Sequence, residues 1–216
     1  VWLEFRRVLF RSGISEECMV NKNEILKERG IKVCAFVQSN NRKRSPLKDG
    51  LPTLEDHRDL QIREAANHLF ALGNDSVFIG DSLPSLEELT DLSNLKEDAI
   101  ELDIKLKVNN EITKKLLSEI YSSRTDEARD AIRAAESRII LGENIIEPEN
   151  TINKEYGDIT IDNVHYQRYM GELQILKVNQ KGDKRTNVVA SILQNRLYLL
   201  KYIRNGKRFY FNIINK

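Results

Sequence analysis

Ile31-Lys-Val-Cys-Ala-Phe-Val37 and Ser76-Val-Phe-Ile-Gly80 are the two stretches that decide the fold of the first part of the chain. Both are short, mostly apolar and rich in strand-forming residues, which is typical of strands buried on both faces of a sheet. The segment between them has apolar residues at helical spacing, which predicts a helix that starts at Thr53 and ends at Gly73. The two strands are therefore expected to run parallel, joined by a helical crossover.

Helices are also expected on either side of this pair. Ser15 is suited to cap a helix that runs to about Glu28, and Gly30 is well placed to end it. Ser85 and Glu88 form a capping-box pattern for a short helix over about residues 84–92. The resulting order of helix, strand, helix, strand and helix is that of repeated αβ units feeding a parallel sheet. Because two strands do not make a stable sheet alone, further strands are expected from an upstream segment or from another chain.

The pattern changes near residue 95. Residues 99–108 (AIELDIKLKV) alternate apolar and charged side chains, which predicts a half-exposed strand. A helix is expected to begin at Asn110, and a charged second helix is expected over residues 126–137. The domain boundary is accordingly predicted within residues 93–98.

From Gly157 onward the sequence predicts a meander of strands. The strand-like runs are DITID, GELQILKV, RTNVVASIL, LYLLKYI and RFYFNII. Asn205-Gly206 between the last two runs is a strong hairpin signal. Residues 99–216 are therefore predicted to form a separate, mainly antiparallel β domain with helices.

The composition limits the classes of function. The chain has 34 Lys and Arg against 33 Asp and Glu, a net charge of +1, so it carries no strong field for nucleic acid or anionic lipid. No apolar run reaches the ~18–20 residues needed to span a bilayer. Two cysteines, Cys18 and Cys34, favour a reducing cytoplasm. No cysteine or histidine group has metal-ligand spacing and no phosphate-binding glycine motif is present, so no metal or cofactor is expected.

Residues 1–12 are set apart from the rest of the sequence. The string LEFRRVLFRS, from Leu3 to Ser12, looks like the translation of a common sequencing adapter. Three arginines against one glutamate give the segment a basic character. We expect it to be non-native and leave it out of the fold prediction, the alternative being an authentic basic amphipathic arm.

Four stretches together resemble one known family. They are AFVQS (residues 35–39), RSPLKDGLPTLEDHR (44–58), VFIGD (77–81), and GDITIDN (157–163) followed by YMGELQI (169–175). This pattern resembles the 6-phospho-N-acetylmuramidase family over nearly all of residues 13–216. The second and fourth stretches are long and unusual, which makes the resemblance specific.

The resemblance implies an architecture. In that family a TIM-like (β/α)8 barrel precedes a cyclophilin-like antiparallel β domain. Residues 13–98 would then be the last part of the barrel, with 31–37 and 76–80 as its final two strands, and residues 99–216 would be the cyclophilin-like domain. The first six barrel strands would lie upstream of Gly13.

The resemblance also implies a reaction. The family hydrolyses the β-1,4 bond of 6-phospho-N-acetylmuramyl-N-acetylglucosamine, a phosphorylated amino-sugar disaccharide, in the bacterial cytoplasm during peptidoglycan recycling. This chain alone is expected to be inactive, because a barrel that lacks six strands has no closed site. The alternative is a non-catalytic carbohydrate-binding or purely structural β-domain fragment. The oligomeric state is not predicted.

Two carboxylates are candidates for the catalytic groups. Glycoside hydrolysis usually needs two carboxyl groups, and a β/α barrel places such groups at the carboxy-terminal ends of its strands or in the loops that follow. Asp81 directly follows the second strand and Glu55 follows the first loop, so both are catalytic candidates. As alternatives, Asp81 caps the following turn, and Glu55 offsets a helix dipole.

The substrate-binding candidates come from both regions. Arg44 lies in a cationic loop and is the candidate for binding the phosphate or the lactyl carboxylate. His57 and Arg58, in the same motif, either contact the sugar or brace the loop. The β domain adds a cluster of polar and aromatic residues that suits sugar recognition, with turn formation as the alternative role: Asp162, Asn163, Tyr169 and Glu172.

Overall fold

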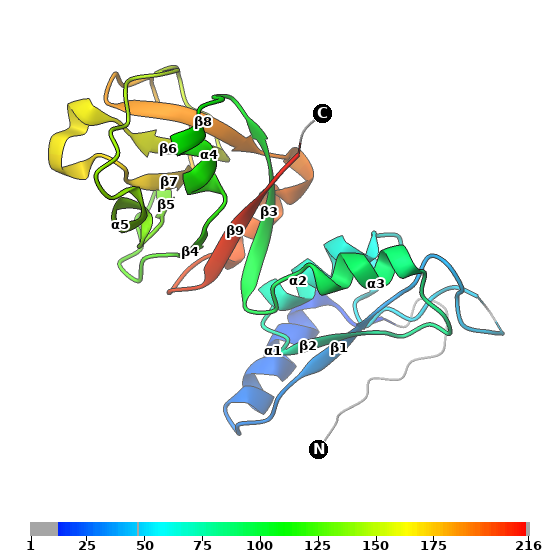
Figure 1. Ribbon diagram of the computed structural model, residues 1–216. Coiled ribbons are helices and arrows are strands. Elements are labelled where there is room, and N and C mark those ends of the chain that lie inside the picture. Colours follow the sequence, from blue (N-terminus) through cyan, green and yellow to red (C-terminus); the bar gives the residue numbers. More distant parts are fainter. Residues whose placement is uncertain (1–12, 47, 215–216) are drawn as a thin grey trace. The chain divides into compact units, whose positions relative to one another are not determined.

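The computed structural model describes residues 13–46 and 48–214, which form two compact units that divide between Asp98 and Ala99 (Figure 1). Residues 1–12, which we expect to be non-native, lie outside the described residues. The first unit contains, in chain order, α1 (Glu16–Lys27), β1 (Cys34–Val37), the 3-10 helix η1 (Glu55–His57), α2 (Ile62–Ala71), β2 (Ser76–Ile79) and α3 (Leu86–Ser93).

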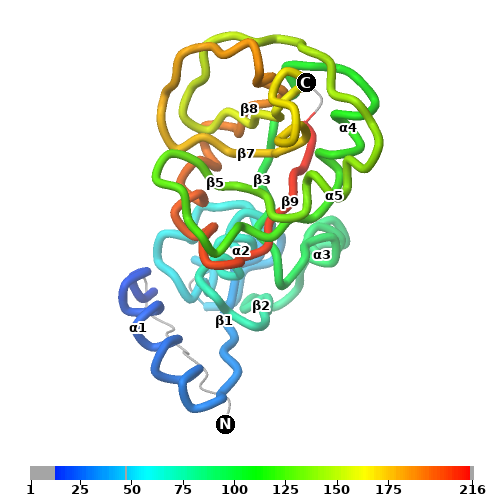
Figure 2. The backbone as a smooth tube through the Cα atoms, turned by 90° about the vertical axis from the view of Figure 1, so that its left-hand side faces the viewer, coloured from blue at the N-terminus to red at the C-terminus, as the bar shows by residue number. Residues whose placement is uncertain are grey.

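The parallel pairing of the first two strands is confirmed. β1 and β2 run parallel, with Ala35 opposite Val77 and Val37 opposite Ile79. Helix α2 packs on both strands and on α3, burying Ala66 and its apolar neighbours (Figure 2). The first unit is thus a small αβαβα assembly around a two-stranded sheet.

The caps of α1 and α3 are confirmed as well. The Ser15 hydroxyl accepts the amide of Cys18 at the start of α1. Ser85 and Glu88 exchange both hydrogen bonds of the capping box at the start of α3. These are local features, in which the capping side chain and its amide partner are three residues apart.

Two predictions for the first unit are wrong. Thr53 does not start a helix, because its amide donates to the carbonyl of Phe36 and its hydroxyl accepts the Phe36 amide at 2.7 Å. Thr53 therefore lies beside β1, and α2 begins only at Ile62. Strand β2 is not buried on both faces, since the ring of Phe78 is 43% exposed. A sheet of two strands leaves each strand with an open edge and little cover.

The second unit is a curled seven-stranded sheet with short helices (Figures 1 and 2). Its elements are β3 (Ala99–Leu106), α4 (Glu111–Leu117), β4 (Ile120–Ser122), β5 (Ala131–Arg133), α5 (Ser137–Leu141), β6 (Asp158–Asp162), the 3-10 segment η2 (Val164–Tyr169), β7 (Leu173–Leu176), β8 (Thr186–Ile192), the 3-10 segment η3 (Gln194–Tyr202) and β9 (Arg208–Ile213). The strand order is β4-β9-β3-β8-β6-β7-β5. All neighbouring pairs are antiparallel except β3 and β9, which are parallel.

Strand β3 is more deeply buried than its alternating sequence predicts. Glu101 and Asp103 are buried although they are charged. The hydroxyl of Tyr210 donates to Glu101 at 2.9 Å, and Arg196 donates to Asp103 at 2.7 Å. Both faces of the strand are covered from Ala99 to Ile104, and these hydrogen bonds satisfy the buried carboxylates. The prediction of a half-exposed strand was wrong.

The helix predicted over residues 126–137 is also absent. The amide of Arg124 donates to the carbonyl of Arg133, and Ser123 forms a bridge with Ala134, so the two ends of this segment pair as extended chains. The charged residues in between form ion pairs across the resulting loop rather than along a helix face. Only the short helix α5 follows.

Of the last two runs predicted to be strands, one forms a strand and the other does not. LYLLKYI forms the 3-10 segment η3 rather than a strand. RFYFNII does form strand β9, which pairs with β3 on one side and β4 on the other and so offers no free edge to another strand. Asn205 and Gly206 adopt the positive φ angles of 53° and 80° that suit an Asn-Gly turn, but the turn joins η3 to β9.

Candidate functional site

A polar pocket lies where the two parallel strands of the first unit end. It measures about 650 Å³ and is formed by the loop that follows β1 and the turn that follows β2. Its lining is dominated by cationic and amide side chains: Asn40, Asn41, Arg42, Lys43, Ser45, Lys48, Ser82 and Leu83. We call this the strand-end pocket. Three cations beside amides and hydroxyls are suited to binding an oxyanion such as a phosphate.

Asp81 holds the loop that forms one wall of this pocket. One carboxylate oxygen accepts the amide of Ser39 and the other accepts the amide of Arg44, both at 2.8 Å. The carboxylate therefore bridges the start and the middle of the loop. Both oxygens are thus occupied by backbone donors of the loop after β1, and not by the turn that follows Asp81, as the capping role considered from the sequence would require.

Glu88 fixes the same loop from α3. Its carboxylate accepts the Asn40 amide at 2.6 Å and the Ser39 hydroxyl at 2.8 Å, in addition to its bond within the capping box. Burial acts to raise the pKa of Glu88, but the hydrogen bonds from Ser85, Asn40 and Ser39 outweigh burial and hold the pKa below its usual value. The sequence indicated only the capping role, because the contact with the loop spans almost 50 residues.

Arg44 lies in the pocket loop, and its role in binding the substrate stays a prediction. Its amide binds Asp81, its side chain is exposed, and the cations that line the strand-end pocket are Arg42, Lys43 and Lys48. The cationic loop was therefore found from the sequence, and the fold adds Arg42, Lys43 and Lys48 as further candidates beside Arg44.

Glu55 and Arg58 form a bidentate ion pair next to the end of the pocket loop. Arg58 Nε donates to Glu55 Oε1 at 2.6 Å and Arg58 Nη2 donates to Glu55 Oε2 at 2.7 Å. Arg58 also donates to the carbonyl of Asp49, and the amide of Gly13 donates to Glu55 Oε2. The hydrogen bond to Glu55 raises the pKa of Arg58, so the pair stays charged. The pair braces the end of the loop, which was one of the two roles considered for Arg58.

His57 is fully buried next to a second histidine. Its Nε2 lies 2.8 Å from Nδ1 of His68, whose Nε2 is 3.7 Å from a carboxylate oxygen of Glu16. Burial, followed by the nearby His68, lowers the pKa of His57 to about 3. His57 is therefore neutral at neutral pH and lies inside the unit, in a bracing position rather than at the surface.

In the second unit, Asp162 and Asn163 lie together at the end of β6. Asn163 is buried and fully bonded, since its side chain donates to Asn187 and Lys184 and accepts the amide of His165. This is the turn-forming role considered from the sequence. Asp162 is also buried and accepts the hydroxyl of Thr186 at 3.0 Å.

The environment of Asp162 changes its acidity. Burial raises the pKa of Asp162 to about 6, the hydrogen bond from Thr186 acts in the opposite direction, and the negative charge of Glu172 raises it further. The Asp162 amide donates to the carbonyl of Glu172, directly before the neighbouring strand β7, which brings the two residues side by side. The cluster predicted from the sequence thus holds two carboxyl groups close to each other.

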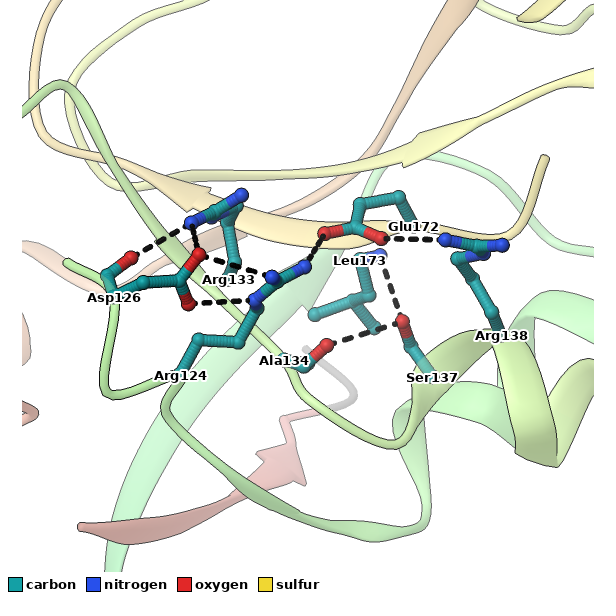
Figure 3. A network of polar contacts seen from close by, with 8 residues as sticks. All are labelled: Arg124, Asp126, Arg133, Ala134, Ser137, Arg138, Glu172 and Leu173. Atoms are coloured by element: carbon teal, nitrogen blue, oxygen red, sulfur yellow. Dashed lines mark hydrogen bonds and ion pairs between the residues drawn. The ribbon is translucent and has the colours of Figure 1, made fainter. Parts of the chain in front are cut away.

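Glu172 belongs to a network of alternating arginines and carboxylates (Figure 3). Arg124 and Arg138 lie 3.7 and 4.0 Å from its two carboxylate oxygens. Arg124 also donates two hydrogen bonds to the carboxylate of Asp126, and Arg133 donates to the same carboxylate at 2.7 Å. The sequence indicated Glu172 but not the arginines, because these come from two other segments that the fold brings to β7.

Tyr169 lies on η2 among further arginines. The guanidinium of Arg168 is 4.8 Å from the centre of the Tyr169 ring and donates to its hydroxyl at 2.8 Å. Tyr166 contacts Tyr169 edge to face, and the guanidinium of Arg185 lies 4.6 Å from the centre of the Tyr166 ring. The exposed Tyr169 and the half-buried Tyr166 are thus paired with guanidinium groups, an arrangement that suits the recognition of anions and polar rings.

Within residues 13–46 and 48–214, no group of three or more His, Cys, Asp or Glu side chains is arranged to hold a metal ion. Within the same ranges no helix has the length and apolar character to cross a bilayer.

Comparison with known proteins supports the resemblance seen in the motifs. Residues 10–94 match the family model described as 6-phospho-N-acetylmuramidase, N-terminal, and residues 100–212 match the C-terminal model of the same family. The chain is similar to the crystal structure of an uncharacterised B. cereus protein, with 31% identity, a TM-score of 0.81 and coverage of 93% of this chain and 59% of that protein. It is also similar to a conserved Enterococcus faecalis protein of unknown function, with 31% identity, a TM-score of 0.57 and coverage of 94% and 55%. A search of curated proteins gave no match.

Proposed function

The chain belongs to the 6-phospho-N-acetylmuramidase family, and from this premise we propose that the full-length enzyme hydrolyses the β-1,4 bond between 6-phospho-N-acetylmuramic acid and N-acetylglucosamine. This chain spans 59% and 55% of its two structural relatives, so the reaction is proposed for the full-length enzyme. The proposed setting is the recycling of peptidoglycan in the bacterial cytoplasm. No metal or nucleotide is assigned a role.

The strand-end pocket is the observation that carries this proposal. A substrate with a 6-phosphate needs a site that compensates two negative charges, and Arg42, Lys43 and Lys48 place three cations around one pocket. The pocket also lies at the carboxyl ends of parallel strands, where β/α barrels place their substrates. We therefore assign the phosphate of the substrate to this pocket.

The architecture proposed for the first unit is the closing part of a TIM-like barrel. One support is that β1 and β2 pair in parallel and are connected through helix α2. Another is that Phe78 and its neighbours are exposed, since further strands would cover them. The second unit is proposed to be cyclophilin-like. A barrel site draws on many strand ends and the described sheet provides two, so we expect no turnover from residues 13–216 alone.

Asp81 and Glu55 stay the proposed catalytic carboxylates of this part of the enzyme, and their contacts suggest how each is to be tested. Glu55 is held as an ion by Arg58, which favours a role as a charged partner over one as a proton donor. Asp81 accepts two amides, so it positions the pocket loop whether or not it also enters the chemistry. Kinetics separates the two roles, because a loss of chemistry lowers kcat while a loosened loop raises KM.

The phosphate assignment is tested by removing the cations from the full-length enzyme. We expect the triple variant R42A/K43A/K48A to lose about tenfold or more of its preference, in kcat/KM, for the phosphorylated over the unphosphorylated disaccharide, because each charge-assisted contact contributes ~1.5–3 kcal/mol. Lys32→Ala is the matched control, since this exposed lysine precedes β1 and lies outside the pocket lining. Arg44→Ala forms a separate arm. An unchanged preference in the triple variant would refute the assignment.

The role of Asp81 is tested by Asp81→Asn in the same enzyme. The amide keeps one acceptor oxygen but places an NH2 group against a backbone N–H, so one of the two loop contacts is lost. We expect turnover to fall more than substrate binding if the carboxylate takes part in the chemical step. A rise in KM at constant kcat would assign Asp81 to positioning alone, and full activity would remove it from the site.

A further inference from the structure

A second, smaller pocket lies in the loop that joins β4 to β5 in the second unit. It has a volume of about 20 Å³, room for one water-sized group such as a single oxygen atom of a larger ligand. Three segments that are distant in the sequence form it: the loop over residues 123–133, Lys177 just after β7, and Ile203 with Arg204 just after η3. We call it the β4–β5 pocket.

Two buried donors of this pocket have no partner among the described residues. The hydroxyl of Ser123 is buried and makes no hydrogen bond there, and neither does Nε of Arg133. A buried polar group that stays unsatisfied costs ~1–3 kcal/mol, so two such groups in one pocket point to a bound acceptor. The acceptor has to offer oxygen lone pairs to a hydroxyl and to a guanidinium at once.

The charge of the lining favours an anion over a water molecule. Arg124, Arg133, Lys177 and Arg204 contribute four cations, against the carboxylates of Asp126 and Glu127. Asp126 is already bonded to Arg124 and Arg133 on the rim (Figure 3). The guanidinium of Arg204 forms no hydrogen bond or ion pair with the residues that the structure describes, which leaves its charge available to a ligand.

We propose that the β4–β5 pocket is a binding site for a small oxyanion, a phosphate or a carboxylate group, held by the Ser123 hydroxyl, Arg133 Nε and the Arg204 guanidinium. This site is separate from the strand-end pocket, and it does not depend on the proposed glycosidase activity. Phosphate and carboxylate share the chemistry that the pocket recognises, namely negative oxygens that accept two or three hydrogen bonds.

Titration calorimetry on the full 216-residue chain tests the site. The titrations use inorganic phosphate in one arm and lactate in the other, and the chain carries R42A/K43A/K48A so that any binding at the strand-end pocket is removed. We expect one saturable site with millimolar or tighter affinity for at least one of the two anions, and the tighter anion identifies the natural group. Failure here leaves the glycosidase proposal intact, because the two pockets share no residue.

Single variants then locate the binding. Arg204→Ala is expected to weaken it about tenfold or more and Ser123→Ala about three- to tenfold, as the loss of a charged and of a neutral hydrogen bond predicts. Arg129→Ala is the matched control, since Arg129 lies in the same loop, pairs with Asp130 and is absent from the pocket lining. Circular dichroism checks that each variant is folded. Absence of saturable binding, as expected for a pocket that holds water only, or an equal loss in Arg129→Ala would overturn the proposal.

Discussion

The two units of this chain differ in how completely their strands are covered. In the first unit the two-stranded sheet leaves Phe78 43% exposed, and Leu86 on α3 is 81% exposed. In the second unit seven strands bury Tyr121 and Phe209 completely, and they bury even the charged Glu101. Both units thus have an apolar core, but that of the second is the larger, and the loops of the first are held largely by polar clamps.

The clamps of the first unit show what holds its loops outside the apolar core that α2 forms with the sheet. Asp81 and Glu88 each bind two points of the pocket loop, and Arg58 ties Glu55 to the carbonyl of Asp49. These contacts are directional and fix the geometry of a site. They contribute less net stability than apolar burial, because each one replaces hydrogen bonds to water.

The largest expected effect comes from removing the same side chain in each unit. Phe209→Ala should lower the free energy of unfolding of the second unit by ~3–5 kcal/mol, because it empties a fully buried position. Phe78→Ala should cost the first unit about 1 kcal/mol or less, because much of the ring already faces solvent. Chemical denaturation followed by residue-resolved NMR measures both. Equal costs would contradict the comparison.

The second-largest expected effect is an opposite dependence of the stability of the two units on pH. The pKa of His57 is lowered to about 3 in the folded state, so the unfolded chain binds the proton more readily, and stability is lost as the pH falls from 6.5 towards 3. The lowered pKa of Glu88 acts in the same direction. The loss in the first unit between pH 7 and 4 is on the order of 3 kcal/mol.

Asp162 gives the second unit the opposite dependence. Its pKa is raised to about 6, so the folded state binds the proton more tightly, and its stabilising effect is complete below about pH 4 and lost as the pH rises through 6. Acid therefore adds on the order of 2 kcal/mol to this unit. Hydrogen exchange at pH 7 and pH 4 should show the first unit opening and the second tightening. Asp162→Asn should abolish the gain, and His57→Gln should reduce the loss; a common pH dependence of both units would contradict this account.

The sequence predicted the elements whose determinants are local. Helix α1 with its Ser15 cap, the Ser85 box and the β1–β2 pair all follow from residues that are near one another in the chain or from a simple apolar run. The cationic loop was found in the same way, because its charges are consecutive. These features need no knowledge of the tertiary fold.

The parts that the sequence missed depend on distant partners. LYLLKYI has the composition of a strand, but β9 is paired on both edges and offers it no place in the sheet. The role of Glu88 in the pocket loop and the arginines around Glu172 each join segments more than 30 residues apart. Alternating charge in residues 99–106 suggested exposure, yet Arg196 of η3 pairs with the charge of Asp103 and Tyr210 of β9 donates a hydrogen bond to Glu101.

The smallest expected effect is one in which the two units should agree. Ser85 caps α3 in the first unit and Asn110 caps α4 in the second, each accepting the amide three residues on, at 3.1 and 2.8 Å. Because this contact is made within one helical turn, Ser85→Ala and Asn110→Ala should each cost about 1 kcal/mol, whatever the surrounding core. Urea unfolding measures both, with Ser118→Ala, at the carboxyl end of α4, as a control. If the two cap variants lose equally little free energy of unfolding while the two phenylalanine variants differ, the difference between the units lies in tertiary packing and not in local helix signals. A much larger loss in Asn110→Ala would show that this cap depends on the core behind it.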